Sequence, residues 1–407
     1  MLTMKKLTVI GAGAFALITS PMARAATYSD AGAGVLVYAK IVVDDQTDTV
    51  VQVANQSASP TAAHCFYVNA NRRCTNTGAV CSGSTDCFDA SSGFTGACLP
   101  GWIEVNFDVL MTPNQPLAWS AAQGLGFKQP AGLFYGNVPC PGGLLNTCPG
   151  SNAGTRVPPV GETPFVGELK CIESDPTTRL PRPCNTNDCT GPGVCCRNDL
   201  IGSASVESLT FEGDIDVERY NAVGLRSAGF NDGDNVLTIG GSGTGPAAPE
   251  YQPCAQVVVF NHLFDGATDP IVDTGLYAHS TLALVPCTED FAEQQVPQVT
   301  AQFLVYNEFE QRFSTSRSVN CLLDTPISLI DTSQPERSIF SASVAGTVAG
   351  NTRITGVNGG IIGSATLAFC PITGCTDPAS GEPQALGAGY DLNQFSDRVD
   401  ADIIRIP

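Results

Sequence analysis

Glycine and proline interrupt this chain so often that long helices are excluded. The sequence contains 42 glycines and 28 prolines in 407 residues, and both residue types end or weaken a regular helix. Short segments with alternating apolar and polar side chains lie between these breaks. In the clearest of them, Ile103, Val105, Phe107 and Val109 alternate with more polar neighbours, which is the pattern of a half-buried strand. The sequence therefore predicts an all-β protein.

The spacing of the remaining strand-like segments favours packed sheets. Strands are expected at residues 35–43, 50–54, 65–68, 165–171, 200–206, 256–260, 282–285, 303–306 and 340–348, with turns at 350–351 and 358–359. Many short strands separated by turn residues are typical of β-sandwiches. We therefore expect one or two antiparallel β-sandwich domains, Ig-like or jelly-roll-like, that carry disulfide-stapled loop insertions.

The first 25 residues have the pattern of an export signal. Residues 1–6 contain two lysines, residues 7–20 are apolar or small, and Ala23-Arg24-Ala25 provides a cleavage site. This pattern is typical of a signal peptide, and its apolar core is too short to span a bilayer comfortably. The sequence predicts a protein exported to the periplasm or the extracellular space, with no membrane span in the mature chain.

The chain contains seventeen cysteines, which an oxidising compartment would convert to disulfides. They are Cys65, Cys74, Cys81, Cys87, Cys98, Cys140, Cys148, Cys171, Cys184, Cys189, Cys195, Cys196, Cys254, Cys287, Cys321, Cys370 and Cys375. The odd number leaves one unpaired, and the sequence does not identify it. No pair has the two-residue spacing that zinc sites favour, so structural disulfides are preferred to a metal or redox site.

The cysteines also help to divide the chain. Two dense groups, at about residues 65–98 and 171–196, interrupt strand-like sequence and are interpreted as stapled loop insertions. Residues 240–250 are rich in glycine and have the composition of a flexible linker. The predicted organisation is a signal peptide at 1–25, a sandwich domain with both insertions at 26–245, and residues 246–407 as a second sandwich or a continuation of the first.

Charge limits the partners of the protein. The formal net charge is −19, and Lys40, Lys128 and Lys170 are the only lysines after the signal. An acidic chain with so few lysines is repelled by phosphate backbones, so nucleic-acid binding is not expected. The ligand class stays open between a protein and a glycan.

Residues that could support catalysis are scarce. The three histidines are His64, His262 and His279, and the chain has no Gly-x-Ser-x-Gly elbow, His-Glu-x-x-His motif or phosphate loop. No catalytic or cofactor-binding residue is predicted. Asp232 and Asp234 have a spacing that can converge oxygens on calcium, although Asp in a turn also hydrogen-bonds its own backbone. Calcium is the one cofactor that the sequence leaves open.

Three segments resemble a known group of proteins. Residues 64–69 (HCFYVN), 165–171 (FVGELKC) and 198–202 (NDLIG) resemble recurring segments of uncharacterised secreted bacterial proteins that are rich in β structure and cysteine. The resemblance implies export and β structure, and it supplies no activity and no site residues.

These observations favour a non-catalytic structural or binding protein of the periplasm, cell surface or extracellular space. Stapled polar loops on a sheet scaffold suit recognition. One alternative is a secreted hydrolase that uses acidic residues, for example on polysaccharide. A second alternative is a calcium-dependent, adhesin-like module.

Overall fold

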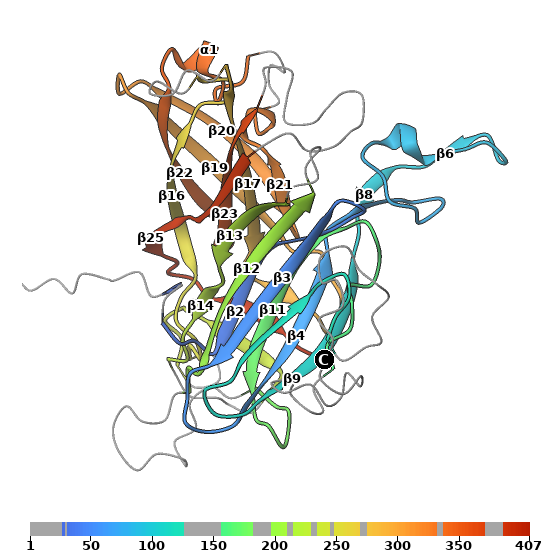
Figure 1. Cartoon of the computed structure of the whole chain (residues 1–407), viewed down its shortest axis with the longest axis vertical. Helices are drawn as coiled ribbons and strands as arrows, with labels where there is room; N and C mark the ends of the chain where they lie inside the picture. The colour runs from blue at the N-terminus through green and yellow to red at the C-terminus, as the bar shows by residue number, and fades with distance from the viewer. Residues whose placement is uncertain are drawn as a thin grey trace, which may run out of the picture.

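The computed structural model describes residues 27–28, 31–125, 156–181, 197–209, 215–228, 234–244, 248–268, 275–331, 337–370 and 386–407. Regular structure in these residues is nearly all β (Figure 1), so the all-β prediction is confirmed. The predicted strand at 340–348 instead contains the four-residue helix α1 (Ala342–Ala345). The predicted signal peptide lies outside the described residues.

Two sheets are built mainly from the first half of the chain. Sheet A has the order β1 (Thr27–Tyr28), β14 (Val223–Leu225), β2 (Val35–Val43), β11 (Phe165–Ser174), β4 (Thr61–Asn69), β9 (Ile103–Met111). Sheet B has the order β10 (Pro116–Ser120), β3 (Thr47–Asn55), β12 (Leu200–Leu209), β13 (Ile215–Asn221). All strand pairs in both sheets are antiparallel.

Three sheets come mainly from the second half of the chain. Sheet C has the order β15 (Val236–Ile239), β26 (Asp402–Arg405), β18 (Glu289–Asp290). Sheet D has the order β20 (Arg312–Asn320), β19 (Gln298–Asn307), β22 (Ala349–Val357), β16 (Ala255–Leu263), β25 (Asn393–Asp397). Sheet E has the order β21 (Leu323–Pro326), β17 (Tyr277–Pro286), β23 (Ile361–Cys370), β24 (Leu386–Asp391).

The prediction of one or two β-sandwich domains is wrong. Apart from two two-stranded sheets in the segment between β4 and β9, the described strands are divided among five sheets, arranged as a five-bladed β-propeller. A sandwich sheet buries one face, whereas sheet A is buried on both. In β2, Leu36 and Tyr38 belong to one apolar cluster, and Val35 and Val37 belong to another. A sheet that packs between neighbours on both faces fits a blade of a propeller.

Apolar clusters join the sheets face to face. The first cluster lies between sheets A and B, for example Tyr67 with Trp119. The second joins sheet A to sheet C and to the nearby ends of β17 and β23 in sheet E. The third lies between sheets D and E, for example Phe303 with Leu284. Each of these interfaces excludes water from apolar side chains, which is the main source of stability in such a fold.

The predicted linker, residues 240–250, makes specific backbone contacts at both of its ends. Gly240 and Gly241 have φ angles of 66° and 90°, which glycine adopts readily. At the other end, the N–H of Glu250 donates to the carbonyl oxygen of Thr238 (2.9 Å), and Tyr251 is fully buried in the second cluster. That cluster combines residues from both sides of position 245, and the domain boundary itself stays a prediction.

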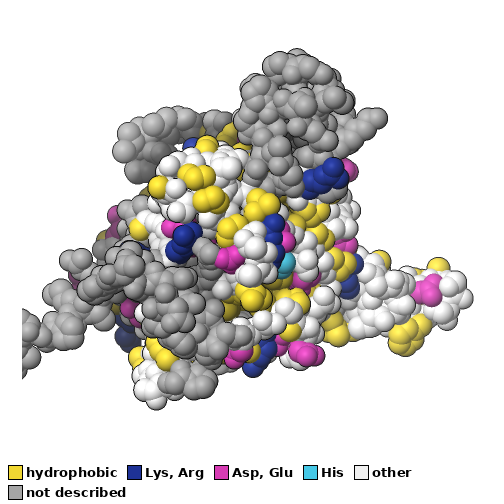
Figure 2. Space-filling view, turned by 90° about the horizontal axis from the view of Figure 1, so that it is seen from below, with side chains coloured by type: hydrophobic (Ala, Val, Ile, Leu, Met, Phe, Trp, Pro, Cys, Tyr) yellow, Lys and Arg dark blue, Asp and Glu magenta, His cyan; other side chains and the backbone are white. Residues whose placement is uncertain are grey.

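A disulfide-bonded hairpin region projects from sheet A between β4 and β9. It contains β5 (Arg72–Cys74), η1 (Ser84–Cys87), β6 (Phe88–Asp89), β7 (Phe94–Thr95) and β8 (Cys98–Pro100). Its buried apolar cluster consists of four cysteines alone, Cys74, Cys81, Cys87 and Cys98. Figure 1 shows this region extending away from the sheets, and the space-filling view of Figure 2 shows hydrophobic side chains on its surface. Disulfides therefore take the place of a hydrophobic core in this segment.

No helix among the described residues is long and apolar enough to cross a membrane.

Candidate binding pocket

A row of polar side chains crosses three neighbouring strands of sheet D. Tyr306 on β19 lies opposite Asn351 on β22, and Asn351 lies opposite Asn261 on β16. Residues directly opposite each other in antiparallel strands share a face of the sheet. None of the three side chains is buried, so the row lies on the outward face.

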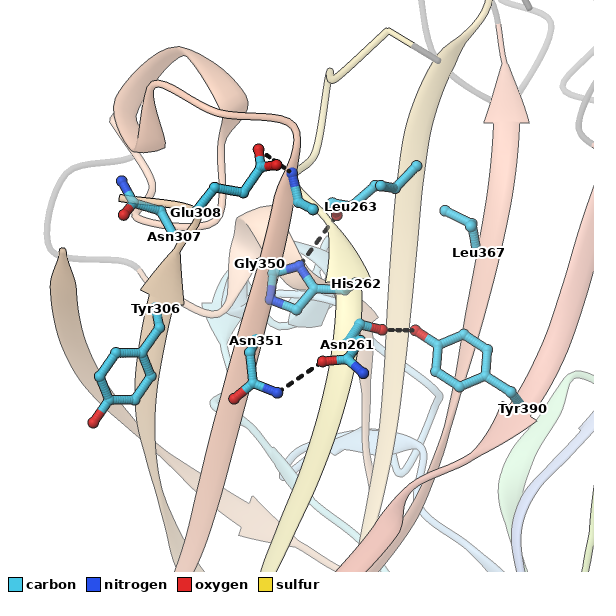
Figure 3. Close-up of a pocket in the computed structure, with 11 residues that line it drawn as sticks. Asn261, His262, Leu263, Tyr306, Asn307, Glu308, Gly350, Asn351, Leu367 and Tyr390 are labelled. Atoms are coloured by element: carbon cyan, nitrogen blue, oxygen red, sulfur yellow. Dashed lines mark hydrogen bonds between the residues drawn. The ribbon is translucent and has the colours of Figure 1, made fainter. Parts of the chain in front are cut away.

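This row borders a hollow in the surface of the described residues. The pocket has a volume of about 590 Å³, and Figure 3 shows its lining. It is lined by Asn261, His262, Leu263, Tyr306, Asn307, Glu308, Ala349, Gly350, Asn351, Leu367 and Tyr390. Its size falls in the range of small-molecule sites.

Hydrogen bonds fix the polar groups beside the pocket. The side-chain amide of Asn351 donates to Oδ1 of Asn261 (2.8 Å), and the hydroxyl of Tyr390 donates to the carbonyl oxygen of Asn261 (3.3 Å). Tyr390 comes from β24 of sheet E, so two sheets meet at the pocket (Figure 3). Groups held in this way present fixed donors and acceptors to a ligand.

Glu308 is the one carboxylate that lines the pocket in the described part of the chain. Its Oε2 accepts hydrogen bonds from the backbone N–H groups of Val348 (3.2 Å) and Ala349 (3.3 Å). The neighbouring Asn307 is buried and holds the turn through its side-chain amide, which donates to the carbonyl oxygen of Ala345 (2.7 Å). Glu308 therefore anchors the pocket rim to the following strand.

His262 lies in the wall of the pocket but is not suited to proton transfer at neutral pH. It is 5 % exposed, and its Nε2 is 2.8 Å from Oγ1 of Thr352. Burial lowers the pKa of His262 to about 4, partly offset by a hydrogen bond to the backbone of Leu263. The imidazole is neutral at physiological pH and acts as a packed polar group.

The other two histidines form pairs with aspartates. Nδ1 of His64 lies 2.8 Å from Oδ1 of Asp108, and Nδ1 of His279 lies 2.8 Å from Oδ1 of Asp265. The second nitrogen of His279 is buried and has no hydrogen-bond partner among the described residues. No described serine is therefore placed to complete a Ser–His–Asp triad there.

Trp102 packs against the second apolar cluster. Its ring centroid lies 6.1 Å from that of Phe291. It is a half-buried packing residue.

The expectation of disulfide bonds is confirmed. The described pairs are Cys65–Cys171, Cys74–Cys87, Cys81–Cys98 and Cys254–Cys287. Cys370 is also disulfide-bonded, and Cys321 is a buried free thiol. Cys140, Cys148, Cys184, Cys189, Cys195, Cys196 and Cys375 lie outside the described residues.

The placement of one cysteine pair differs from the sequence interpretation. Cys65 and Cys171 lie directly opposite each other on β4 and β11, in the core of sheet A and not in loop insertions. The sulfurs of Cys74, Cys81 and Cys87 approach within the distance range of a metal site. Because all three are in disulfides, they offer no thiolate to a metal.

The calcium candidates are only partly described. Oδ1 of Asp234 accepts a hydrogen bond from the N–H of Val236 (2.7 Å) at the start of β15, as expected for turn chemistry. Asp232 lies outside the described residues. The calcium site stays a prediction.

The two interpretations of this turn predict different melting behaviour. If Asp234 only caps the turn, EDTA leaves the melting midpoint of the protein unchanged, and this is the result we expect. Thermal melting with EDTA and with added calcium measures it. A midpoint that falls in EDTA, recovers with calcium and no longer responds in Asp234→Asn would instead establish a calcium site.

Comparisons with protein-family models, curated proteins and solved structures find no match to this chain. The pocket residues are contributed by five strands and one turn that are far apart in the sequence. Of them, sequence reasoning singled out His262 alone. Tyr306, Asn351 and Tyr390 carried no motif, because their proximity depends on strand register.

Proposed function

We propose that the protein is an exported, non-catalytic binding protein whose pocket takes a neutral, hydroxyl-rich ligand such as a segment of a glycan. The pocket on sheet D is the observation that carries this proposal. It offers amide and phenol groups beside an open apolar surface. A sugar needs both kinds of group, since its hydroxyls exchange hydrogen bonds and its C–H face packs on aromatic rings.

The carboxylate content of the pocket supports binding over hydrolysis. Most glycosidases need two carboxyl groups that face each other across the scissile bond. Among the described residues, Glu308 is the only acid that lines this pocket, and two backbone N–H groups occupy one of its oxygens. The pocket is equipped to hold a ligand, and its described lining contains no second carboxylate that could take part in cleavage.

Export is supported by the disulfides. Five described cysteine pairs or half-pairs are oxidised, including the pair in the core of sheet A. Disulfides form and persist in oxidising compartments. The predicted periplasmic or extracellular location is consistent with them.

A glycan array followed by titration with the best ligand tests the proposal. We expect Tyr306→Ala to weaken binding by about tenfold or more, because one aromatic contact is worth about 1 kcal/mol or more. Gln302→Ala is the matched control: Gln302 is exposed on the same strand and lies outside this pocket. Absence of binding to every glycan, or equal weakening by both variants, would contradict the proposal.

A further inference from the structure

A lysine and two glutamates lie together in the interior between sheets A and C. The side chains of Glu168, Lys170 and Glu289 are all 0 % exposed. Nζ of Lys170 donates to both carboxylate oxygens of Glu168, at 2.9 Å each, and to the carbonyl oxygen of Pro286 at 3.2 Å. It also contacts Oε2 of Glu289.

The surroundings of this cluster are apolar. Lys170 on β11 lies opposite Phe66 on β4 and Val37 on β2, and both belong to the second apolar cluster. Phe66 stacks on Phe291, with ring centroids 4.0 Å apart. In such an interior a buried ammonium is costly even when it is paired. Burial lowers the pKa of Lys170, but the neighbouring Glu168 and Glu289 raise it by more. The ammonium must therefore pass its proton to a carboxylate in direct contact before the amine can react.

We propose that Lys170 and Glu289 condense to an amide, which covalently joins β11 of sheet A to β18 of sheet C, with Glu168 as the proton acceptor. The two residues are 119 positions apart in the chain. The proposal is independent of the binding function proposed above.

The reaction needs no oxidant and no cofactor. Lys170 passes one proton from its ammonium to the carboxylate of Glu168 and becomes a neutral amine. The lone pair of Nζ attacks Cδ of protonated Glu289, and the N–C bond forms. The C–OH bond of Glu289 then breaks, and Glu168 relays a proton from nitrogen to the departing hydroxyl. The products are an amide, one water molecule and a protonated Glu168.

Protonation distinguishes the two glutamates. Burial raises the pKa of Glu289 well above its usual range. The positive charge of Lys170 opposes this rise. The negative charge of Glu168 adds to it, as does the hydrogen bond that protonated Glu289 donates to Glu168. Glu289 therefore carries the proton that its hydroxyl needs in order to leave as water. Glu168 accepts two hydrogen bonds from the ammonium, as a carboxylate does.

Position and environment both favour condensation. Groups held in contact react with effective concentrations of about 10⁵ M or more when their geometry is aligned. The product replaces a buried ammonium and a buried carboxylate with neutral groups, and it releases water from an apolar interior.

Mass spectrometry of the exported protein tests the proposal directly. After full reduction and alkylation, we expect the intact mass to be lower than the sequence mass by one water molecule. Trypsin should fail to cleave after Lys170, and a branched peptide should join the segments that contain Lys170 and Glu289. The sequence mass with normal cleavage after Lys170 would overturn the proposal, as would a cross-link from Lys170 to Glu168.

Two variants and an internal control sharpen the test. Lys170→Arg keeps the charge but cannot form this amide, so it should have the full sequence mass. Glu168→Gln keeps both reacting residues but removes the proton acceptor, so the uncross-linked form should accumulate. Lys40 also lies near two acids, Glu218 (3.4 Å) and Asp324 (3.8 Å), but is partly exposed, and trypsin should cleave after it normally. If a variant does not fold, the intact mass and the tryptic peptides of the wild-type protein still decide the question.

Discussion

Removing the Cys65–Cys171 disulfide should lower the free energy of unfolding by about 4 to 5 kcal/mol. The bond closes a loop with a sequence separation of 106 residues, and a cross-link over a long loop removes much of the entropy of the unfolded chain. Both cysteines are fully buried. Urea unfolding of Cys65→Ala/Cys171→Ala under non-reducing conditions measures the loss.

Cys74→Ala/Cys87→Ala is the matched control for this double variant. Its cysteines are 13 positions apart and lie in the projecting hairpin region, whose buried cluster is made of cystines alone. We expect that variant to keep the global unfolding midpoint and to gain proteolytic cleavage sites within residues 72–100. An equal global loss in the two double variants would show that the hairpin region is part of the same cooperative unit.

Stability should fall as the pH rises towards about 8 because of Glu173. Burial raises the pKa of Glu173 to about 8, and the negative charge of Asp199 adds to the rise. Between its unfolded pKa and its folded pKa, the native state holds a proton that the unfolded chain releases. Stability is therefore highest below about pH 4.5 and decreases up to about pH 8, by about 5 kcal/mol for this group.

Glu173→Gln should remove this part of the pH dependence. Glu173 is fully buried, accepts a hydrogen bond from the hydroxyl of Thr61 (3.0 Å) and accepts another from the N–H of Asp199 (3.1 Å). A neutral amide of the same shape resembles the protonated acid at every pH. Urea midpoints at pH 5 and pH 9 compare the variant with wild type, and exposed Glu293→Gln is the control. Parallel pH profiles for wild type and Glu173→Gln would show that Glu173 is ionised in the native state.

The strands could be predicted better than their arrangement. Residues 35–43 were expected as a strand and form β2 with the same bounds. The same apolar run is compatible with one buried face or with two, because a continuous apolar segment does not show how many sheets cover it. Whether such strands form a sandwich or a propeller depends on which sheet packs on each face of a given sheet. This packing brings together residues as far apart in the sequence as Val37 and Ile404, and no local sequence pattern predicts it.

The candidate sites could be predicted less well. Cysteine count and context were sufficient to expect disulfides, but the Cys65–Cys171 pairing follows from strand register. Lys170 is one of three lysines in the predicted mature chain, and that scarcity was the only sequence signal for the buried cluster. Its partner Glu289 comes from a two-residue strand, which alternation cannot detect.

Sheet C has a consequence for the order in which the chain can fold. β26 pairs with β15 on one side and with β18 on the other, and these two strands do not pair with each other. A ribosome or a translocation channel delivers residues 236–239 and 289–290 long before residues 402–405. Until then, Leu237 and Ile239 lack the strand that covers them, and this blade is the last to close. Closure of sheet C thus waits for β26, and the apolar side chains of β15 stay without that partner strand until residues 402–405 have emerged.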